Sequence, residues 1–155
     1  MADIRQLLKE YGESHQHPVN KLIHWVCVPL IVWSLLAIIS TIKVPDFFNR
    51  LPVSFSWAEV TIIIAMIYYF LVSFALAVGI LLVFSLMLLL TFLLASTGVA
   101  IWQVALTIFI LAWIGQFIGH KIEGKKPSFF KDLQFLLVGP LWLLAHIYDG
   151  LGIKY

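Results

Sequence analysis

The chain has 155 residues, of which 62% are hydrophobic and 12% are charged, and its formal net charge is +2. A chain this small cannot bury so much apolar surface in water, since soluble domains are about 45–50% apolar and about 25% charged. The composition therefore predicts a single membrane domain over residues 1–155, while the weak charge argues against a nucleic-acid partner and the one cysteine excludes an internal disulfide.

The first predicted element is a short amphipathic helix over residues 3–11. Ile4, Leu7, Leu8 and Tyr11 recur at the spacing of one helix face. We expect this helix to lie on the membrane surface. A frayed terminus is the alternative, because the first residues of a chain are often poorly ordered.

Apolar stretches then predict four transmembrane helices, at approximately residues 22–42, 58–75, 78–96 and 99–119. At about 1.5 Å per residue the first reaches roughly 30 Å, the thickness of the hydrocarbon core. From Trp57 to Gly119 the only charged residue is Glu59, so this stretch holds about three further crossings. Gly115 and Gly119 form a small-xxx-small pair, which predicts close helix packing. The expected fold is an all-α integral membrane protein.

The last apolar stretch, residues 131–148, is shorter, and Gly139 and Pro140 interrupt its centre. Proline removes a backbone donor and kinks a helix. A C-terminal re-entrant or interfacial helix pair therefore fits this stretch better than a fifth crossing.

The positions of the basic residues predict the topology. They precede the first crossing and follow the fourth: Arg5, Lys9 and Lys21, then Lys121, Lys125, Lys126 and Lys131. Four crossings return the chain to its starting side, so both basic groups share one face. Basic loops tend to stay inside, which makes that face cytoplasmic. We expect a multi-pass protein with both termini on the cytoplasmic face, in the inner membrane of a bacterium or the endoplasmic reticulum of a eukaryote.

Four histidines are expected at the same cytoplasmic boundary. His15, His17 and His24 lie at the start of the first crossing, and His120 lies at the end of the fourth. Neutral imidazole is the commonest protein ligand for transition metals. Two interpretations stay open: a metal held by His15, His24 and His120, or histidines that bond to water, lipid headgroups or backbone carbonyls.

Polar residues lie about one helical turn from two of these histidines. Asn20 precedes His24 by four residues, Gln116 precedes His120 by four, and Glu123 follows His120 by three, so each set shares a helix face. We expect Asn20 and Gln116 either to orient imidazoles or to hold helices together by hydrogen bonds.

Two stretches carry a resemblance to a known family. They are YGESHQHPVNKLIHWVCVPLIVWS at residues 11–34 and WIGQFIGHKIEGKKPSFFKDLQFLLVGPLWLL at residues 113–144. In order and spacing they resemble the small multi-pass 2-hydroxy fatty acid dioxygenases, and the resemblance covers roughly residues 3–145. It implies an oxidoreductase that uses Fe(II) and dioxygen to shorten 2-hydroxy fatty acids by one carbon with release of carbon dioxide, as in fatty acid α-oxidation.

The resemblance also implies a ligand set. The family's histidine positions fall on His15, His24 and His120, and either His17 or Glu123 would complete the coordination of the iron. A histidine-rich site with open positions for substrate and dioxygen is typical of non-haem iron chemistry. Zinc in place of iron stays open.

Further roles follow from this scheme. The catalytic residues beside the metal would be Asn20, Gln116 and Glu123. The substrate carboxylate would be attracted by Lys121, Lys125 or Lys126. The implied partners are a 2-hydroxy fatty acid, dioxygen and membrane lipid, and the oligomeric state stays open between a monomer and a homo-oligomer.

Two other functions remain as alternatives. His24 and His120 could hold a haem between the first and fourth crossings, which would make the chain a haem-binding membrane redox protein. Alternatively, the chain could be a non-catalytic lipid-binding membrane protein whose histidines line a polar collar. A transporter fits less well, because mid-membrane ionisable residues are missing from the predicted crossings.

Overall fold

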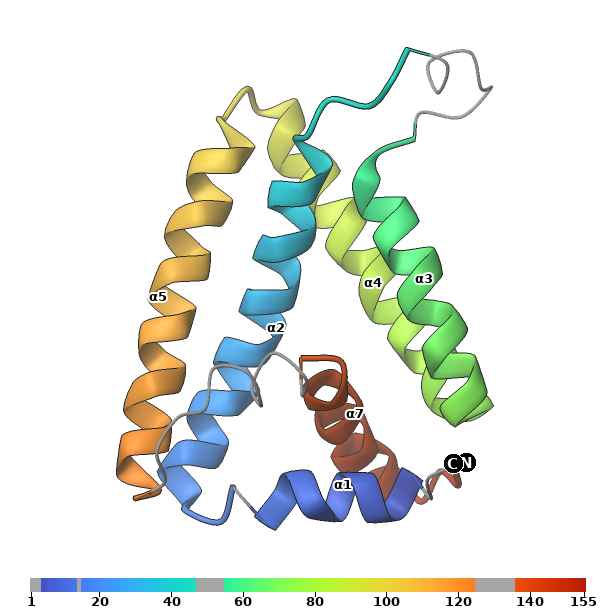
Figure 1. The fold of residues 1–155 in the computed structure, drawn as a ribbon, viewed down its shortest axis with the longest axis vertical. Coiled ribbons are helices and arrows are strands. Elements are labelled where there is room, and N and C mark those ends of the chain that lie inside the picture. Colours follow the sequence, from blue (N-terminus) through green and yellow to red (C-terminus); the bar gives the residue numbers. More distant parts are fainter. Residues whose placement is uncertain (1–3, 14, 47–54, 125–135) are drawn as a thin grey trace.

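The computed structural model describes residues 4–13, 15–46, 55–124 and 136–155, and within these ranges the regular secondary structure is helical. The helices are α1 (Ile4–Glu13), α2 (Pro18–Ser40), α3 (Trp57–Val72), α4 (Phe74–Ser96), α5 (Ile101–Ile122) and α7 (Val138–Leu151). Helices α2 to α5 run alternately up and down, α1 lies across their lower end, and α7 sits above α1 (Figure 1). The predicted all-helical class is confirmed.

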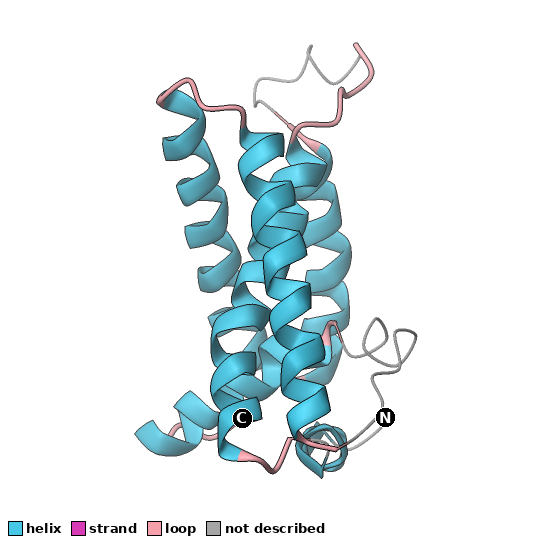
Figure 2. Ribbon diagram, turned by 90° about the vertical axis from the view of Figure 1, so that its left-hand side faces the viewer, coloured by secondary structure: helices cyan, strands magenta, loops and turns pink. Residues whose placement is uncertain are grey.

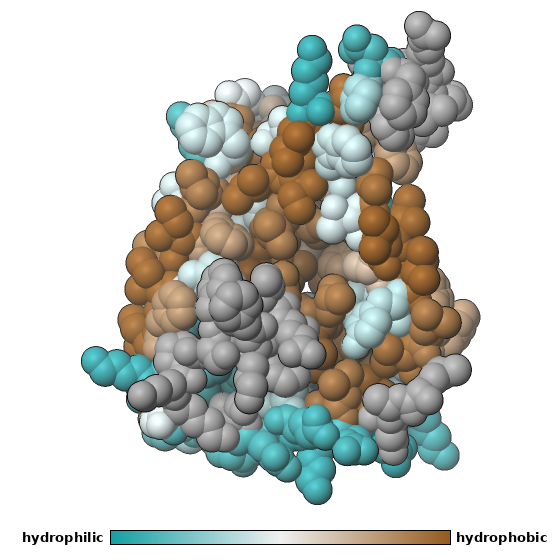
Figure 3. All heavy atoms as spheres, viewed as in Figure 1, coloured by the Kyte–Doolittle hydropathy of each residue, from teal (hydrophilic) through white to brown (hydrophobic). Residues whose placement is uncertain are grey.

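Three of the described helices, α2, α4 and α5, are long and apolar enough to cross a membrane. Helix α3 is apolar but has 16 residues, fewer than the roughly 20 that a full crossing needs. On the face shown in Figure 3, apolar residues form a broad band and hydrophilic residues gather at the lower end, over α1. The expected layout of four crossings therefore stays a prediction.

The break between α3 and α4 lies at Ser73, the first residue of the stretch Ser73–Gly79 in which the sequence predicts a break. The backbone N–H of Ser73 ends α3 by bonding to the Tyr69 carbonyl at 2.9 Å. Its hydroxyl then caps α4 by accepting the Leu76 N–H at 3.3 Å. A single serine serves both helices because its oxygen can satisfy an N–H that has no partner within the helix.

The carboxylate of Glu59 caps the N-terminus of α3. Its carboxylate accepts the backbone N–H of Ser56 at 2.8 Å and also bonds to the Ser56 hydroxyl, while that hydroxyl accepts the Ala58 N–H. This reciprocal capping box begins α3. The only charged residue between Trp57 and Gly119 therefore has a structural role at a helix end.

Helix α7 corrects the expectation that Gly139 and Pro140 interrupt an apolar helix at its centre. Both residues lie in the first turn of α7, which begins at Val138. The first N–H groups of a helix have no internal partner, so a proline there costs no hydrogen bond. The predicted first member of a re-entrant pair falls mostly on residues 131–135, which lie outside the described residues.

Helices α2 and α5 pack along each other (Figures 1 and 2). A Cβ atom on Gly119 would collide with the carboxamide oxygen of Asn20, and one on Gly115 would lie 2.7 Å from the Cys27 sulfur. The small-xxx-small prediction is confirmed: only glycine lets the two backbones approach this closely.

The predicted amphipathic helix is present as α1, and its apolar face is buried inside the protein. Leu8 and Tyr11 belong to a core cluster with Leu141 and Trp142 of α7. Helix α1 thus holds α7 against the lower end of the bundle, and it carries the chain to the first histidine.

Candidate metal centre

His15 is held in place by the end of α1. Its backbone N–H bonds to the Gly12 carbonyl at 2.9 Å, and its Nδ1 lies 2.7 Å from the Tyr11 carbonyl. Its ring stacks on the Tyr11 ring with centroids 4.3 Å apart, and the Trp142 ring lies 5.7 Å away. The imidazole is therefore fixed in orientation by one hydrogen bond and two aromatic contacts.

His24 lies on α2, one turn after Asn20. Its Nδ1 is 2.9 Å from the Asn20 carbonyl, and its side chain is buried. The chain enters α2 through Pro18, whose fixed φ suits the first helical position, and this start places His24 two turns into the helix.

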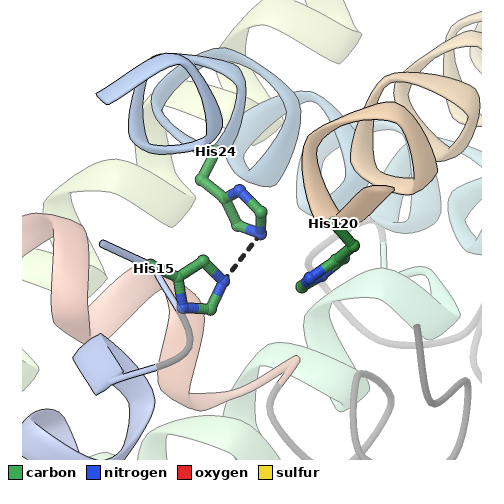
Figure 4. A group of neighbouring side chains, drawn as sticks. All are labelled: His15, His24 and His120. Atoms are coloured by element: carbon green, nitrogen blue, oxygen red, sulfur yellow. Dashed lines mark hydrogen bonds between the residues drawn. The ribbon is translucent and has the colours of Figure 1, made fainter. Parts of the chain in front are cut away.

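His120 comes from the last turn of α5 and completes a cluster of three imidazoles (Figure 4). Its ring centroid lies 5.1 Å from that of His24 and 5.5 Å from that of His15. The exposed fractions of the three side chains are 3%, 2% and 8% for His15, His24 and His120. One nitrogen of each lies within 4.8 Å of the others, so the structure brings together the three histidines that the topology predicts.

The hydrogen bonds of this cluster assign its tautomers. A carbonyl oxygen can only accept, so the Nδ1 atoms of both His15 and His24 must carry protons. Their Nε2 atoms, 2.9 Å apart, are then unprotonated in the neutral rings and present two lone pairs to each other. A proton shared between the two Nε2 atoms, as in the hydrogen bond drawn in Figure 4, or a bound metal cation offsets this repulsion. The donor set therefore fits a divalent transition metal, for which neutral imidazole is a preferred ligand.

Glu123, at the C-terminal end of α5, links this helix to the start of α2 by hydrogen bonds. Its carboxylate accepts the backbone N–H groups of Gln16 at 2.8 Å and His17 at 2.9 Å, and the Asn20 carboxamide N–H at 3.0 Å. Partial burial opposes ionisation, but these donors outweigh it and lower the pKa of the Glu123 carboxyl. The negative charge also lies at the N-terminus of α2, where the helix dipole favours it.

Asn20 is fully buried and contacts both sides of the centre. Its carboxamide N–H donates to Glu123 and its backbone carbonyl fixes His24, while its side-chain oxygen lies against Gly119. That oxygen is the one buried side-chain polar atom without a hydrogen-bond partner among the described residues. Leaving this oxygen without a partner costs free energy, which the hydrogen bonds of Asn20 to Glu123 and His24 offset.

The chain as a whole also matches known proteins. The chain matches, over residues 1–151, the model of a family described as 2-hydroxy-palmitic acid dioxygenase Mpo1-like. The chain belongs to this Mpo1-like family. It is also similar to the 2-hydroxy-palmitic acid dioxygenase MPO1 of Saccharomyces cerevisiae, at 29% identity over 157 residues that cover 98% of this chain and 83% of the relative. No solved structure matches the chain.

Membership of the Mpo1-like family confirms the resemblance seen in the two motifs, and the family name supports an oxidoreductase of the dioxygenase class. Two further residues of interest, Gln116 and Lys121, lie close to His120 on α5. Gln116 is buried one turn before His120, and Lys121 is exposed beside it. Lys125 and Lys126 lie outside the described residues.

His17 does not join the three converging imidazoles. It is the N-cap of α2, it is exposed, and its Nδ1 accepts the Val19 N–H at 3.2 Å. Its backbone N–H, in contrast, bonds to Glu123. The structure thus uses His17 to begin a helix.

Two aromatic residues of the site were not predicted. Tyr11 and Trp142 pack against the His15 ring and against each other, with their own centroids 5.6 Å apart. Both lie within the two motifs that carry the family resemblance, so the sequence did point to these two positions. Their role could not be assigned, because nothing local in the sequence shows that α7 returns to α1.

Proposed function

We propose that this chain is an Fe(II)-dependent dioxygenase that shortens 2-hydroxy fatty acids by one carbon and releases carbon dioxide. The observation that carries the proposal is the convergence of three buried imidazoles, His15, His24 and His120. Two of them have Nδ1 fixed by backbone carbonyls, so that Nε2 is available to a metal. The family name adds the substrate class, a 2-hydroxy acid.

The reaction balances with dioxygen as the only oxidant. The bond between C1 and C2 of the 2-hydroxy acid breaks, C1 leaves as carbon dioxide, and C2 becomes the carboxyl carbon of the shortened acid. One water forms, and the substrate supplies all the electrons that dioxygen accepts. No 2-oxoglutarate or other reductant is needed. Bound Fe(II) supplies the one-electron chemistry that activation of dioxygen requires.

The residues of the chain hold and shield this centre. His15, His24 and His120 would bind the iron, and the rings of Tyr11 and Trp142 pack against His15 and cover part of its ring. A site that excludes water also limits side reactions of activated oxygen. Glu123 and Asn20 would keep α2 and α5 in register, so that the imidazoles stay at bonding distance from one ion.

The position of the centre suits a lipid substrate. We propose the four-crossing layout, with the centre at the cytoplasmic end of the bundle, in an inner membrane or the endoplasmic reticulum. Transfer of an acyl chain from water into a bilayer is favourable by about 0.8 kcal/mol per buried methylene. The polar end of the fatty acid then stays at the interface. Lys121, Lys125 and Lys126 would attract the carboxylate to this face.

The geometry favours a single ion over the alternative of a haem. A haem would need its porphyrin ring between His24 and His120, but the His15 ring packs against both of them. An absorption spectrum separates the two proposals, because haem gives an intense Soret band and a histidine-bound ferrous ion does not.

The proposal is tested on protein purified in detergent, loaded anaerobically with Fe(II) and then exposed to dioxygen and 2-hydroxypalmitic acid. We expect stoichiometric iron by elemental analysis, and pentadecanoic acid and carbon dioxide by mass spectrometry. A variant with His15→Ala, His24→Ala and His120→Ala should insert into membranes but hold no iron and form no product. Turnover retained in this triple variant would refute the proposal.

A further inference from the structure

A hydrophobic pocket lies between α2, α4 and α7, away from the metal centre. All of its lining side chains are apolar, and they include Trp25, Val28, Val32, Val83, Met87 and Leu144. The three imidazoles do not contribute to this pocket, and the chemistry proposed above does not use it.

A second cleft opens at the polar end of the molecule, between α1, the start of α2 and α7. It reaches the metal centre, because His15 lines it together with Trp142 and His146. Its charged lining residues are Lys9, Lys21, Glu13 and Asp149. Asp149 accepts a hydrogen bond from the Tyr155 hydroxyl at 3.2 Å, whereas Lys21 is half-buried on the first turn of α2.

One face of α2 joins the polar cleft to the hydrophobic pocket. Lys21 and Trp25 are four residues apart, and Val28 and Val32 follow at the spacing of the same helix face. At 1.5 Å per residue this stripe extends about 17 Å from Lys21 toward the centre of the bundle. His146 of the polar cleft marks the junction, since its ring lies 6.4 Å from that of Trp25.

We infer that the cleft and the pocket together form the binding site for a long-chain 2-hydroxy acid, with the carboxylate beside Lys21 and the acyl chain between α2, α4 and α7. This assignment rests on the proposed function for the identity of the polar end. An acyl chain is the occupant that matches this apolar pocket, because the pocket continues from a polar cleft that contains Lys21 and the metal-centre residue His15. The junction at Trp25 and His146 would lie where the polar end of the ligand meets its tail.

Photo-crosslinking tests the path on the unmodified, iron-loaded protein in lipid nanodiscs. The probe is 2-hydroxypalmitic acid with a diazirine near its methyl end. We expect crosslinks on α4 at Val83 to Met87, and their loss when unlabelled 2-hydroxypalmitic acid competes. Crosslinks that fall on the exposed faces of the helices, or that do not respond to the competitor, would overturn the assignment.

Substitution tests the same path by chain length. Val83→Trp fills the pocket, whereas Leu86→Trp adds the same side chain on the exposed face of α4, where Leu86 is 65% accessible. For Val83→Trp we expect kcat/KM to fall about tenfold or more for 2-hydroxypalmitic acid and to change less than about twofold for 2-hydroxyoctanoic acid, because the short chain buries fewer methylenes. Leu86→Trp should leave both values unchanged. Equal losses on both substrates in Val83→Trp would contradict the inference.

The two tests separate this inference from the proposed function. Competed crosslinks in the pocket of a protein that forms no shortened acid would support the binding site and refute the proposed chemistry. Turnover of 2-hydroxypalmitic acid with crosslinks elsewhere would leave the chemistry standing and refute the acyl path.

Discussion

Asn20 at the start of α2 donates a 3.0 Å hydrogen bond from its carboxamide to the carboxylate of Glu123, 103 residues later in the chain. The same asparagine holds His24 by its backbone carbonyl. The bond therefore couples the distance between α2 and α5 to the orientation of one of the imidazoles, and it makes Glu123 part of the support of the centre.

Replacing Glu123 by glutamine should weaken metal binding. The amide keeps the size of the side chain, but it has one acceptor oxygen and turns an NH₂ group toward N–H donors that now lose their partner. We expect the affinity for Fe(II) to fall about 10- to 100-fold, the usual effect of losing a residue that supports a metal ligand. Calorimetric titration under anaerobic conditions measures it. Glu10→Gln, which removes the same charge from the exposed face of α1, should bind Fe(II) like the unmodified protein; an equal loss in both variants would contradict the structural role of Glu123.

Adding Fe(II) should stabilise the folded protein. A ligand at about 100 times its dissociation constant adds about 2.7 kcal/mol to the free energy of unfolding when it binds only the folded state. Thermal denaturation in detergent should show a higher Tm with Fe(II), and a chelator should reverse it. In His24→Ala the rise in Tm should disappear, because the two remaining histidines, His15 and His120, cannot hold the ion as tightly as all three. A Tm rise of the same size in His24→Ala would place the iron elsewhere.

His17→Ala should keep its metal. The His17 ring caps α2 by accepting the Val19 N–H and lies outside the converging cluster. We expect a loss of about 1 kcal/mol in the free energy of unfolding, as for other helix N-caps, with an unchanged iron content by elemental analysis. Loss of iron in this variant would make His17 a fourth ligand.

Gly119→Ala should separate α2 from α5. The added methyl group would meet the buried Asn20 carboxamide, a side chain held on its other edge by Glu123. Overpacking of this kind costs about 1–3 kcal/mol, and here it should also lower the affinity for Fe(II). Gly150→Ala in α7 is the matched control, since a methyl group there meets open space and alanine favours a helix by about 0.5–1 kcal/mol. Thermal denaturation and iron titration of both variants give the comparison; equal effects would argue against close packing as the cause.

Much of the fold could be predicted from local patterns. The apolar stretches predict the helices because the length and hydropathy of a segment are properties of that segment alone. The predicted even number of crossings then places His24 and His120 at the same end, and the structure brings these two histidines together. The exact helix ends were less predictable. Ser73 both ends α3 and caps α4, and Pro140 lies in the first turn of α7. Such ends depend on which backbone groups lack a hydrogen-bond partner, and this is not visible in the sequence.

The sequence by itself determined that this protein is helical and that its helices are apolar enough to lie in a membrane. It also determined that histidines lie at one end of the helical bundle. Tertiary structure decided which polar groups support them. That Glu123 holds Asn20, and that Trp142 covers His15, depends on the rotation and spacing of helices that are far apart in the chain. Those are set by packing, such as the contact of Gly119 with Asn20, and no local pattern encodes a distance between residues on different helices.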